Sequence, residues 1–256
     1  MRKWLAASLA LGTASLAAAH PAHAPEHEGP YKVVVVLAHP DDELVFAPAI
    51  HGLAKGGFEV TVVFATNGDQ GPGVSGMEPG DALAKARIAE AHCSTNALGV
   101  TQMYRLALGD GTLGIEARKQ GSAAKRMLGE IGEYLEGATK VITWGPEGGY
   151  GHSDHRMVGA VVTQHLQSLP PAERPELLYP ALVNSPLPDM LVEQGWTTTS
   201  PDLAPVDYAY NPADRAAATT ATQCHKTQFD DATRAALVPG FDALVWKGKV
   251  SFRKAF

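Results

Sequence analysis

The sequence predicts an α/β fold: a Rossmann-like, doubly wound and mostly parallel sheet with helices on both faces. Residues 32–38 (KVVVVLA) and 59–66 (EVTVVFAT) are continuous, β-branched apolar runs, which are typical of strands buried on both sides. Between them, residues 42–56 have the apolar spacing of a helix that ends at Gly56-Gly57. Strand and helix patterns keep alternating along the chain, which favours one parallel sheet with one core.

The first 24 residues have the layout of a secretory signal peptide. Arg2 and Lys3 precede a short apolar stretch that ends in small residues. Cleavage after Ala24 competes with cleavage near Ala19, and a retained membrane anchor is the alternative. Residues 25–30 continue as a flexible leader. We therefore expect an exported protein, periplasmic or secreted, with no stable membrane insertion after cleavage.

From Tyr31 to the end of the chain we expect a single domain, residues 31–256, since no repeat or linker interrupts the alternation. After a Gly-rich loop at 67–80, the predicted elements are a helix over 81–98, a strand at 102–106, a helix at 115–135, a strand at 140–144, a helix at 154–169, a strand at 177–182 and a helix at 212–230. Residues 183–210 are rich in Pro and give no clear prediction.

In open α/β sheets, ligands bind beyond the carboxyl ends of the parallel strands. Three segments should meet at that edge, namely 38–43, 66–73 and 144–155. The first and the third hold clusters of His and acidic residues. The sequence therefore predicts that both clusters belong to one site.

The segment AHPDDE at 38–43 has the composition of a metal site. Zn²⁺ binds His nitrogen and carboxylate oxygen, and a catalytic site leaves one position open. Pro40 keeps the chain extended after His39, so the next turn can bring His39 and Asp42 to one metal while Asp41 points toward the water. A helix cap is the alternative, but it accounts for only one of these residues.

The segment GHSDH at 151–155 follows another predicted strand. His152 and His155 are three positions apart at a helix start, so both can face the same crevice. The glycines before them let the backbone approach a ligand closely. Two unrelated surface histidines would be the alternative if the segment did not lie at the carboxyl end of a strand.

Together, AHPDDE and GHSDH resemble the PIG-L (LmbE-like) family of zinc-dependent N-acetylglucosaminyl deacetylases. The resemblance runs from about residue 32 to 228 and includes three looser pieces: T66-N67-G68, R87-x-x-E90 and H225-K226-T227-Q228. It implies a hydrolase that uses metal-activated water to remove an N-acetyl group from an N-acetylglucosamine-type sugar or glycoconjugate. The expected cofactor is Zn²⁺, with Fe²⁺ or another divalent ion as the alternative.

The resemblance also implies roles for individual residues. The metal ligands would be His39, Asp42 and His155. Asp41 would be the general base, and a protonated His152 would stabilise the oxyanion and help the amine to leave. Asp154 would hydrogen-bond His152 and set its protonation state.

Arg87 and Asn67 are the candidates for substrate binding. Arg87 is expected to reach a substrate hydroxyl or phosphate, and a structural ion pair with Glu90 is the alternative. Asn67 belongs to the T-N-G piece that follows the second strand.

Two cysteines, Cys93 and Cys224, exclude a disulfide-rich scaffold. They either form one bridge or are two unrelated buried thiols, and the second interpretation is preferred here. Loss of Arg2 and Lys3 with the signal segment would take the formal net charge from −6 to −8. Such a charge argues against nucleic acid as a partner and leaves a small-molecule or oligosaccharide substrate. The oligomeric state is unknown from sequence.

Two other functions fit part of the pattern. The same ligands could serve an amidase for another N-acyl substrate, such as a glycopeptide or a thiol conjugate. A non-catalytic exported protein that binds metal or sugar would not need Asp41 and His152. Nucleophilic hydrolysis by Ser or Cys finds no support, because there is no G-x-S-x-G motif and both cysteines lie within predicted helices.

Overall fold

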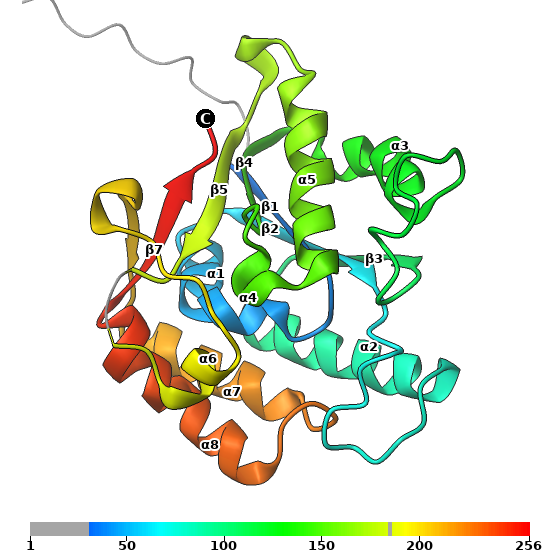
Figure 1. Ribbon diagram of the computed structural model, residues 1–256. Coiled ribbons are helices and arrows are strands. Elements are labelled where there is room, and N and C mark those ends of the chain that lie inside the picture. Colours follow the sequence, from blue (N-terminus) through cyan, green and yellow to red (C-terminus); the bar gives the residue numbers. More distant parts are fainter. Residues whose placement is uncertain (1–30, 184–185) are drawn as a thin grey trace, which may run out of the picture.

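The computed structural model describes residues 31–183 and 186–256, so the predicted signal segment and the leader at 25–30 lie outside the described residues (Figure 1). Within those residues, seven strands form one sheet in the order β3-β2-β1-β4-β5-β7-β6. Their bounds are β1 (Lys32–Leu37), β2 (Glu59–Thr66), β3 (Gln102–Leu108), β4 (Ala138–Thr143), β5 (Glu176–Ala181), β6 (Val206–Ala209) and β7 (Lys249–Lys254).

The first five strands of the sheet pair in parallel, and β7 runs antiparallel to both of its neighbours, β5 and β6. The chain moves outward from β1 to β3 and then returns to β4 on the other side of β1. The strand order therefore reverses between β1 and β4, where open α/β sheets form their ligand crevice. The predicted doubly wound, mostly parallel sheet is confirmed, and the antiparallel edge strands are an addition to it.

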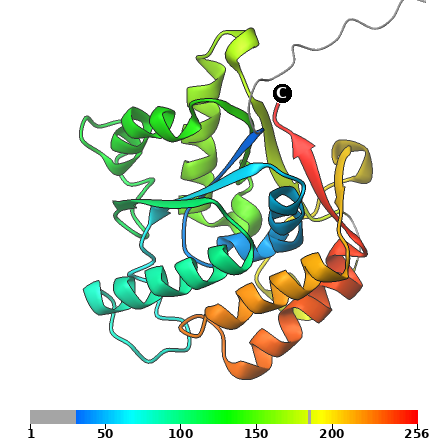
Figure 2. The same ribbon diagram turned by 180° about the vertical axis from the view of Figure 1, so that it is seen from behind.

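Helices cover both faces of the sheet (Figures 1 and 2). Their bounds are α1 (Ala47–Lys55), α2 (Asp81–Ala97), α3 (Ala123–Leu135), α4 (Gly148–Gly151), α5 (Ser153–Gln167), α6 (Asp189–Glu193), α7 (Pro212–Cys224) and α8 (Asp231–Gly240). Short 3₁₀ turns lie at Asp42–Phe46, Pro171–Glu173 and Pro201–Leu203, and a π-helical turn lies at Phe241–Trp246. No helix among the described residues has the length and apolar composition for crossing a membrane.

The side chains of strand β1 alternate between two hydrophobic cores, one on each face of the sheet. Val33, Val35 and Leu37 pack into the core under α1, α2, α7 and α8, whereas Val34 and Val36 pack into the core under α3 and α5. All five side chains are fully buried. This explains the continuous apolar run, because a strand with helices on both faces has no solvent-facing side.

Two predicted helices have different bounds in the structure. The helix expected at 115–135 starts at Ala123, because the hydroxyl of Ser122 accepts a hydrogen bond from Lys125 N and Glu116 has a left-handed backbone (φ 51°). The helix expected at 212–230 ends at Cys224, since His225 leaves the helical conformation and its side chain turns inward.

Cys93 on α2 and Cys224 on α7 form a disulfide, so the preferred interpretation of two unrelated thiols is wrong. The two helices pack against each other and bring the Cα atoms to 5.8 Å, within the range that a disulfide spans. The sequence pattern of each helix showed a buried face but carried no information on which helix it would meet.

Candidate active site

The two predicted clusters meet at the point where the strand order reverses. Strands β1 and β4 are neighbours, with Val36 opposite Thr143, and the segments that follow them converge. His39 Nδ1 lies 3.3 Å from His155 Nε2 although the residues are 116 positions apart. The structure therefore places AHPDDE and GHSDH in one site, as the sequence predicted.

Three donor atoms face one another there. Asp42 Oδ1 lies 3.1 Å from His155 Nε2 and 3.8 Å from His39 Nδ1, and the two imidazole nitrogens are 3.3 Å apart. In a tetrahedral zinc site with bonds of about 2.0–2.2 Å, the donor atoms lie about 3.3–3.6 Å from each other. The spacing of the three atoms matches that of ligands around one small cation.

The second nitrogen of each imidazole faces a hydrogen-bond acceptor. His155 Nδ1 is 3.2 Å from the carbonyl oxygen of Gly148, to which it donates. His39 Nε2 is 3.1 Å from Asp110 Oδ1 and donates in the same way. In the neutral imidazoles, the nitrogens that face Asp42 are then unprotonated and can bind a metal.

Asp42 is held so that only one of its oxygens faces the two histidines. Its Oδ2 accepts hydrogen bonds from the backbone N–H of Ala38 and His39 and from Trp144 Nε1, at 2.9–3.0 Å. The Trp144 ring also stacks on the His155 ring, with the ring centroids 4.3 Å apart. Trp144 therefore holds the orientation of both Asp42 and His155. Two imidazole nitrogens and one carboxylate oxygen that converge to 3.1–3.8 Å are suited to binding a cation, so the residues fit a divalent metal.

Two other groups of donor atoms lie within 4.8 Å of one another, His39 with His152 and His155, and His39 with Asp110 and Asp154. Burial opposes charge on His39, but the surrounding carboxylates, Asp110 first, raise its pKa well above the usual value. The environment of His39 therefore stabilises positive charge, whether that charge is a proton or a metal ion.

Asp41 lies beside the donor atoms in a left-handed backbone conformation (φ 106°), which is uncommon for a residue other than glycine. Its N–H donates to Glu43 Oε2 at 3.0 Å, which holds that conformation. Burial raises the pKa of Asp41 to about 6, although the Arg87 guanidinium opposes the shift. The side chain keeps 20% of its surface exposed, so it can reach a ligand.

Glu43 and His225 form a fully buried ion pair behind the site. Glu43 Oε1 accepts from His225 Nε2 at 2.6 Å and from the hydroxyl of Ser94 at 2.5 Å. Burial works against both charges, but each partner stabilises the other: the pKa of His225 is raised and that of Glu43 is lowered. Two residues further on, Thr227 donates to Glu90 from its N–H and its hydroxyl. His225 and Thr227 of the H-K-T-Q piece thus support the site from behind.

The contacts of His152 and Asp154 differ from those predicted. His152 caps α5 through its Nδ1, which accepts from the backbone N–H of Asp154 at 3.2 Å. The Asp154 carboxylate instead accepts from Gly111 N and Leu113 N and lies 3.4 Å from His39 Nε2. Burial and the neighbouring histidines lower the pKa of His152. These contacts favour a neutral His152 with its proton on Nε2, not the protonated form expected from sequence.

Arg87 is 4% exposed and binds the protein itself. It donates to the carbonyl oxygens of Pro40 at 2.6 Å and Gly68 at 2.9 Å, and its charge lies 3.3 Å from Asp41 Oδ1. The predicted alternative of an ion pair with Glu90 is wrong, because the charge partner is Asp41. Arg87 therefore positions the loop that carries Asp41, and contact with a substrate remains a prediction.

Asn67 does not join the cluster. Its Oδ1 accepts from Arg105 at 3.3 Å, and the residue lines a separate surface hollow with Asp81 and Lys85. The preceding side chain, Thr66, turns the other way and donates to Ala38 O, as expected for neighbours at the end of a strand. The structure gives no support for Asn67 as a substrate-binding residue.

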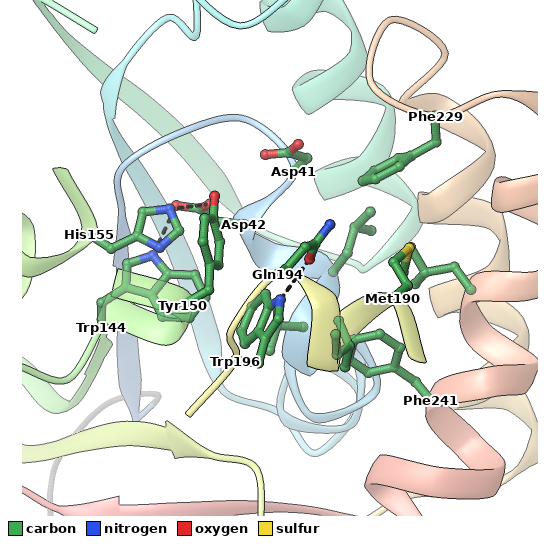
Figure 3. Close-up of a pocket in the computed structure, with 14 residues that line it drawn as sticks. Asp41, Asp42, Trp144, Tyr150, His155, Met190, Gln194, Trp196, Phe229 and Phe241 are labelled. Atoms are coloured by element: carbon green, nitrogen blue, oxygen red, sulfur yellow. Dashed lines mark hydrogen bonds and ion pairs between the residues drawn. The ribbon is translucent and has the colours of Figure 1, made fainter. Parts of the chain in front are cut away.

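Two cavities open on the donor atoms and share Asp41, Asp42 and Tyr150. The first has a volume of about 240 Å³ and is polar; its other lining residues are His39, Gln70, Gly71, Arg87, Asp110, Gly111, His152 and Gln228. The second has a volume of about 450 Å³ and is mostly apolar (Figure 3); its other lining residues are Leu44, Val45, Trp144, His155, Met190, Leu191, Gln194, Trp196, Phe229, Leu237 and Phe241.

Sequence reasoning missed three residues of this site: Asp110, Trp144 and Tyr150. Asp110 lies in Gly109-Asp110-Gly111, which follows β3 at the same edge of the sheet as the two motifs. Its position after a parallel strand was the signal from which Asp110 could have been predicted as a site residue. Trp144 and Tyr150 belong to the predicted 144–155 segment, but their types gave no indication that they would contact the donors.

Comparison with known proteins assigns the family. Residues 34–166, more than half of the chain, match the profile of PIG-L, which is described as GlcNAc-PI de-N-acetylase. The chain belongs to the PIG-L family. Both motifs of the site lie within the PIG-L segment, whereas α6, α7 and α8 lie beyond it.

Among curated PIG-L relatives, the chain is 36% identical over 143 residues to a 1D-myo-inositol 2-acetamido-2-deoxy-alpha-D-glucopyranoside deacetylase of Corynebacterium diphtheriae. The match covers 49% of this chain and 48% of that protein. The chain thus matches about half the length of such relatives.

Two solved structures show how widely the fold is used. The N,N'-diacetylchitobiose deacetylase of Pyrococcus horikoshii has a TM-score of 0.61 at 20% identity, covering 87% of this chain and 83% of that one. The 4-carboxy-2-hydroxymuconate hydratase GalB of Pseudomonas putida has a TM-score of 0.58 at 16% identity, covering 88% and 96%. Since proteins with different activities share this fold, the function must be argued from the site.

Proposed function

We propose that this protein removes an N-acetyl group from an N-acetylglucosamine-type sugar or glycoconjugate by metal-dependent hydrolysis. The observation that carries the proposal is the set of three converging donor atoms, His39 Nδ1, Asp42 Oδ1 and His155 Nε2, with the Asp41 carboxylate beside them. The deacetylase activities of the PIG-L relatives support the choice of substrate class.

Zn²⁺ is the metal we propose for these donors, because two imidazoles and one carboxylate oxygen are typical of catalytic zinc sites. When bound, such a metal polarises a carbonyl group and lowers the pKa of water from about 15.7 toward 7.

The residues of this chain have separate tasks in the reaction. Asp41 accepts the proton of the attacking water, whose oxygen forms a bond to the carbonyl carbon. His152 donates from Nε2 to the oxygen on which negative charge develops, since its Nδ1 is occupied by Asp154 N–H. The C–N bond then breaks, Asp41 passes the proton that it took from water to the nitrogen, and the products are acetate and a free amino sugar.

The proposal is tested by measuring acetate and free amine released from N-acetylglucosamine, its disaccharide and cell-envelope fragments. Purified protein is stripped with a chelator and reloaded in parallel with Zn²⁺ or Fe²⁺. We expect about one metal ion per chain, no turnover after stripping and recovery after reloading. Release of neither product from any N-acetylated sugar by metal-loaded protein would contradict the proposed activity.

We also propose that the protein acts outside the cytoplasm. The signal-like first 24 residues support this, and so does the Cys93–Cys224 disulfide, since such bonds persist in oxidising compartments. Intact mass analysis of the native protein should show loss of the segment up to Ala19 or Ala24. It should also show no thiol that reacts with an alkylating reagent before reduction. A full-length chain with two reactive thiols would contradict export.

A further inference from the structure

The apolar cavity is larger than an acetyl group requires. Its volume of about 450 Å³ lies within the range of about 300–1,000 Å³ that encloses drug-sized ligands. A single methyl group, the apolar part of acetate, would leave most of it unfilled. The cavity therefore points to a longer apolar group on the substrate.

The walls of this cavity are suited to hydrocarbon. Ten of its fourteen lining residues are aliphatic, aromatic or Met. The indole N–H of Trp144 is bonded to Asp42, and that of Trp196 is bonded to Gln194, so both rings have no free donor to offer. An apolar chain would remove these apolar walls from water.

The cavity begins at the reacting groups and leads away from them (Figure 3). Asp42 and His155 lie at one end, and Phe229, Met190 and Phe241 lie at the other. Met190 is 38% exposed, which places it at the rim. A chain that starts at the donor atoms would run between α6 and α8 toward solvent.

The polar cavity lies against the same donor atoms and is suited to the opposite end of an amide. Gln70, Asp110 and Gln228 offer it hydrogen-bonding groups, and its volume of about 240 Å³ is half that of the apolar cavity. An amide at Asp41 therefore has a polar amine component on one side and an apolar acyl component on the other.

We propose that this site accepts N-acyl groups well beyond acetyl, with the amino sugar in the polar cavity and the acyl chain in the apolar one. The inference rests on the proposed amide hydrolysis at this site and extends its substrate class to N-acylated amino sugars with medium-length chains. The reaction balances as before: water supplies oxygen to the acyl carbon and a proton to nitrogen, releasing a fatty acid and the amino sugar.

A chain-length series tests this directly. N-acetyl-, N-butanoyl-, N-hexanoyl- and N-octanoylglucosamine all release glucosamine, so one amine assay serves all of them. We expect kcat/KM to rise with chain length, by up to about fourfold for each added methylene, and then to level off. That ratio corresponds to about 0.8 kcal/mol per buried methylene. A kcat/KM that falls steadily from acetyl onward would overturn the proposal.

A pair of variants on α6 tests the location. Met190→Glu places a charge in the apolar cavity, whereas Val192→Glu changes a residue of the same helix that is 61% exposed and does not line the cavity. We expect Met190→Glu to lower the octanoyl-to-acetyl ratio of kcat/KM at least about tenfold, and Val192→Glu to leave it unchanged. An equal ratio in both variants would overturn the assignment.

Binding separates this inference from the proposed hydrolysis. The same ligands are titrated calorimetrically into metal-loaded Asp41→Asn protein, which retains the cavity. Affinity that rises with chain length while wild-type protein hydrolyses none of the ligands supports the cavity and contradicts the hydrolase. If wild-type protein releases acetate but affinity does not rise with acyl chain length, the proposed role of the apolar cavity is overturned and the proposed hydrolysis is not. A gain seen only with alkyl glycosides of N-acetylglucosamine overturns it too, because the apolar group would then be on the sugar.

Discussion

The two cavities at the donor atoms differ in where their residues come from. Apart from Gln228, the polar cavity is lined by Arg87 of α2 and by residues of the segments that follow parallel strands, all within the PIG-L segment 34–166. Half of the apolar cavity is lined by residues beyond 166, from α6, α8 and their flanking segments. In the proposed reaction, the sheet edge supplies the chemistry and the later helices supply the fit to the substrate.

Changing His155 to Ala should have the largest effect, because it removes one of the three donor atoms. We expect metal affinity to fall at least about 100-fold, and turnover to fall with it, since changes to outer-shell partners alone cost about 10–100-fold. Metal content by mass spectrometry checks this. His165→Ala is the control, because His165 is on the same helix but lines a hollow at the other end of the sheet. Full metal content in His155→Ala would exclude this residue as a ligand.

Asp41→Asn should separate chemistry from metal binding within the polar cavity. Asn tolerates the left-handed backbone but does not accept the proton of water, so kcat should fall about 10²–10⁴-fold while metal content stays the same. Steady-state kinetics beside metal analysis measure both. The exposed Asp202→Asn is the control. Unimpaired turnover would remove Asp41 as the base.

The double substitution of Cys93→Ser and Cys224→Ser removes the disulfide between α2 and α7 and should lower the stability of the fold. We expect the free energy of unfolding to fall by about 2–4 kcal/mol, as is typical for loss of a disulfide. Urea denaturation of the oxidised protein and the double variant measures the difference. The reduced wild-type protein should match the variant, and equal stability of all three forms would show that the bond contributes nothing.

Trp196→Ala should act on the apolar cavity alone. With N-octanoylglucosamine we expect KM to rise about tenfold, which corresponds to about 1.4 kcal/mol of lost apolar contact, with little change in kcat or metal content. A loss confined to kcat would contradict the division of roles between the two cavities, since the segments beyond residue 166 would then take part in the chemistry.

Asn67→Ala should have the smallest effect. Because Asn67 faces Arg105 and a separate hollow, we expect kcat/KM to change less than about twofold. The same assay as above measures it. A tenfold loss would restore the substrate-binding role that the sequence suggested.

The fold could be predicted from sequence where a pattern has one physical meaning. The apolar runs of β1 and β2 fit only strands covered on both faces, and the observed bounds agree with the predicted ones to within a residue. Placing 38–43 and 144–155 after such strands was enough to bring His39, Asp42 and His155 together.

The remaining features depend on tertiary contacts that no local pattern encodes. Glu43 and His225 are 182 positions apart, and their pairing follows from how α7 packs beside the site. His152 caps α5 through its Nδ1, a contact that its place in a metal motif did not suggest. Asp110 is a single acid in a glycine-rich turn and gave no cluster to notice.

The disulfide has a consequence for resistance to proteolysis. It joins residues 131 positions apart, so the closed loop contains β3, β4, β5 and β6 and also the exposed turn around Glu116 and Lys119. A protease that cuts the backbone once anywhere between Cys93 and Cys224 leaves both fragments covalently joined. A cut between Cys93 and His155 would place His39 and His155 on different fragments. The disulfide would still join these fragments, so the nicked molecule need not come apart.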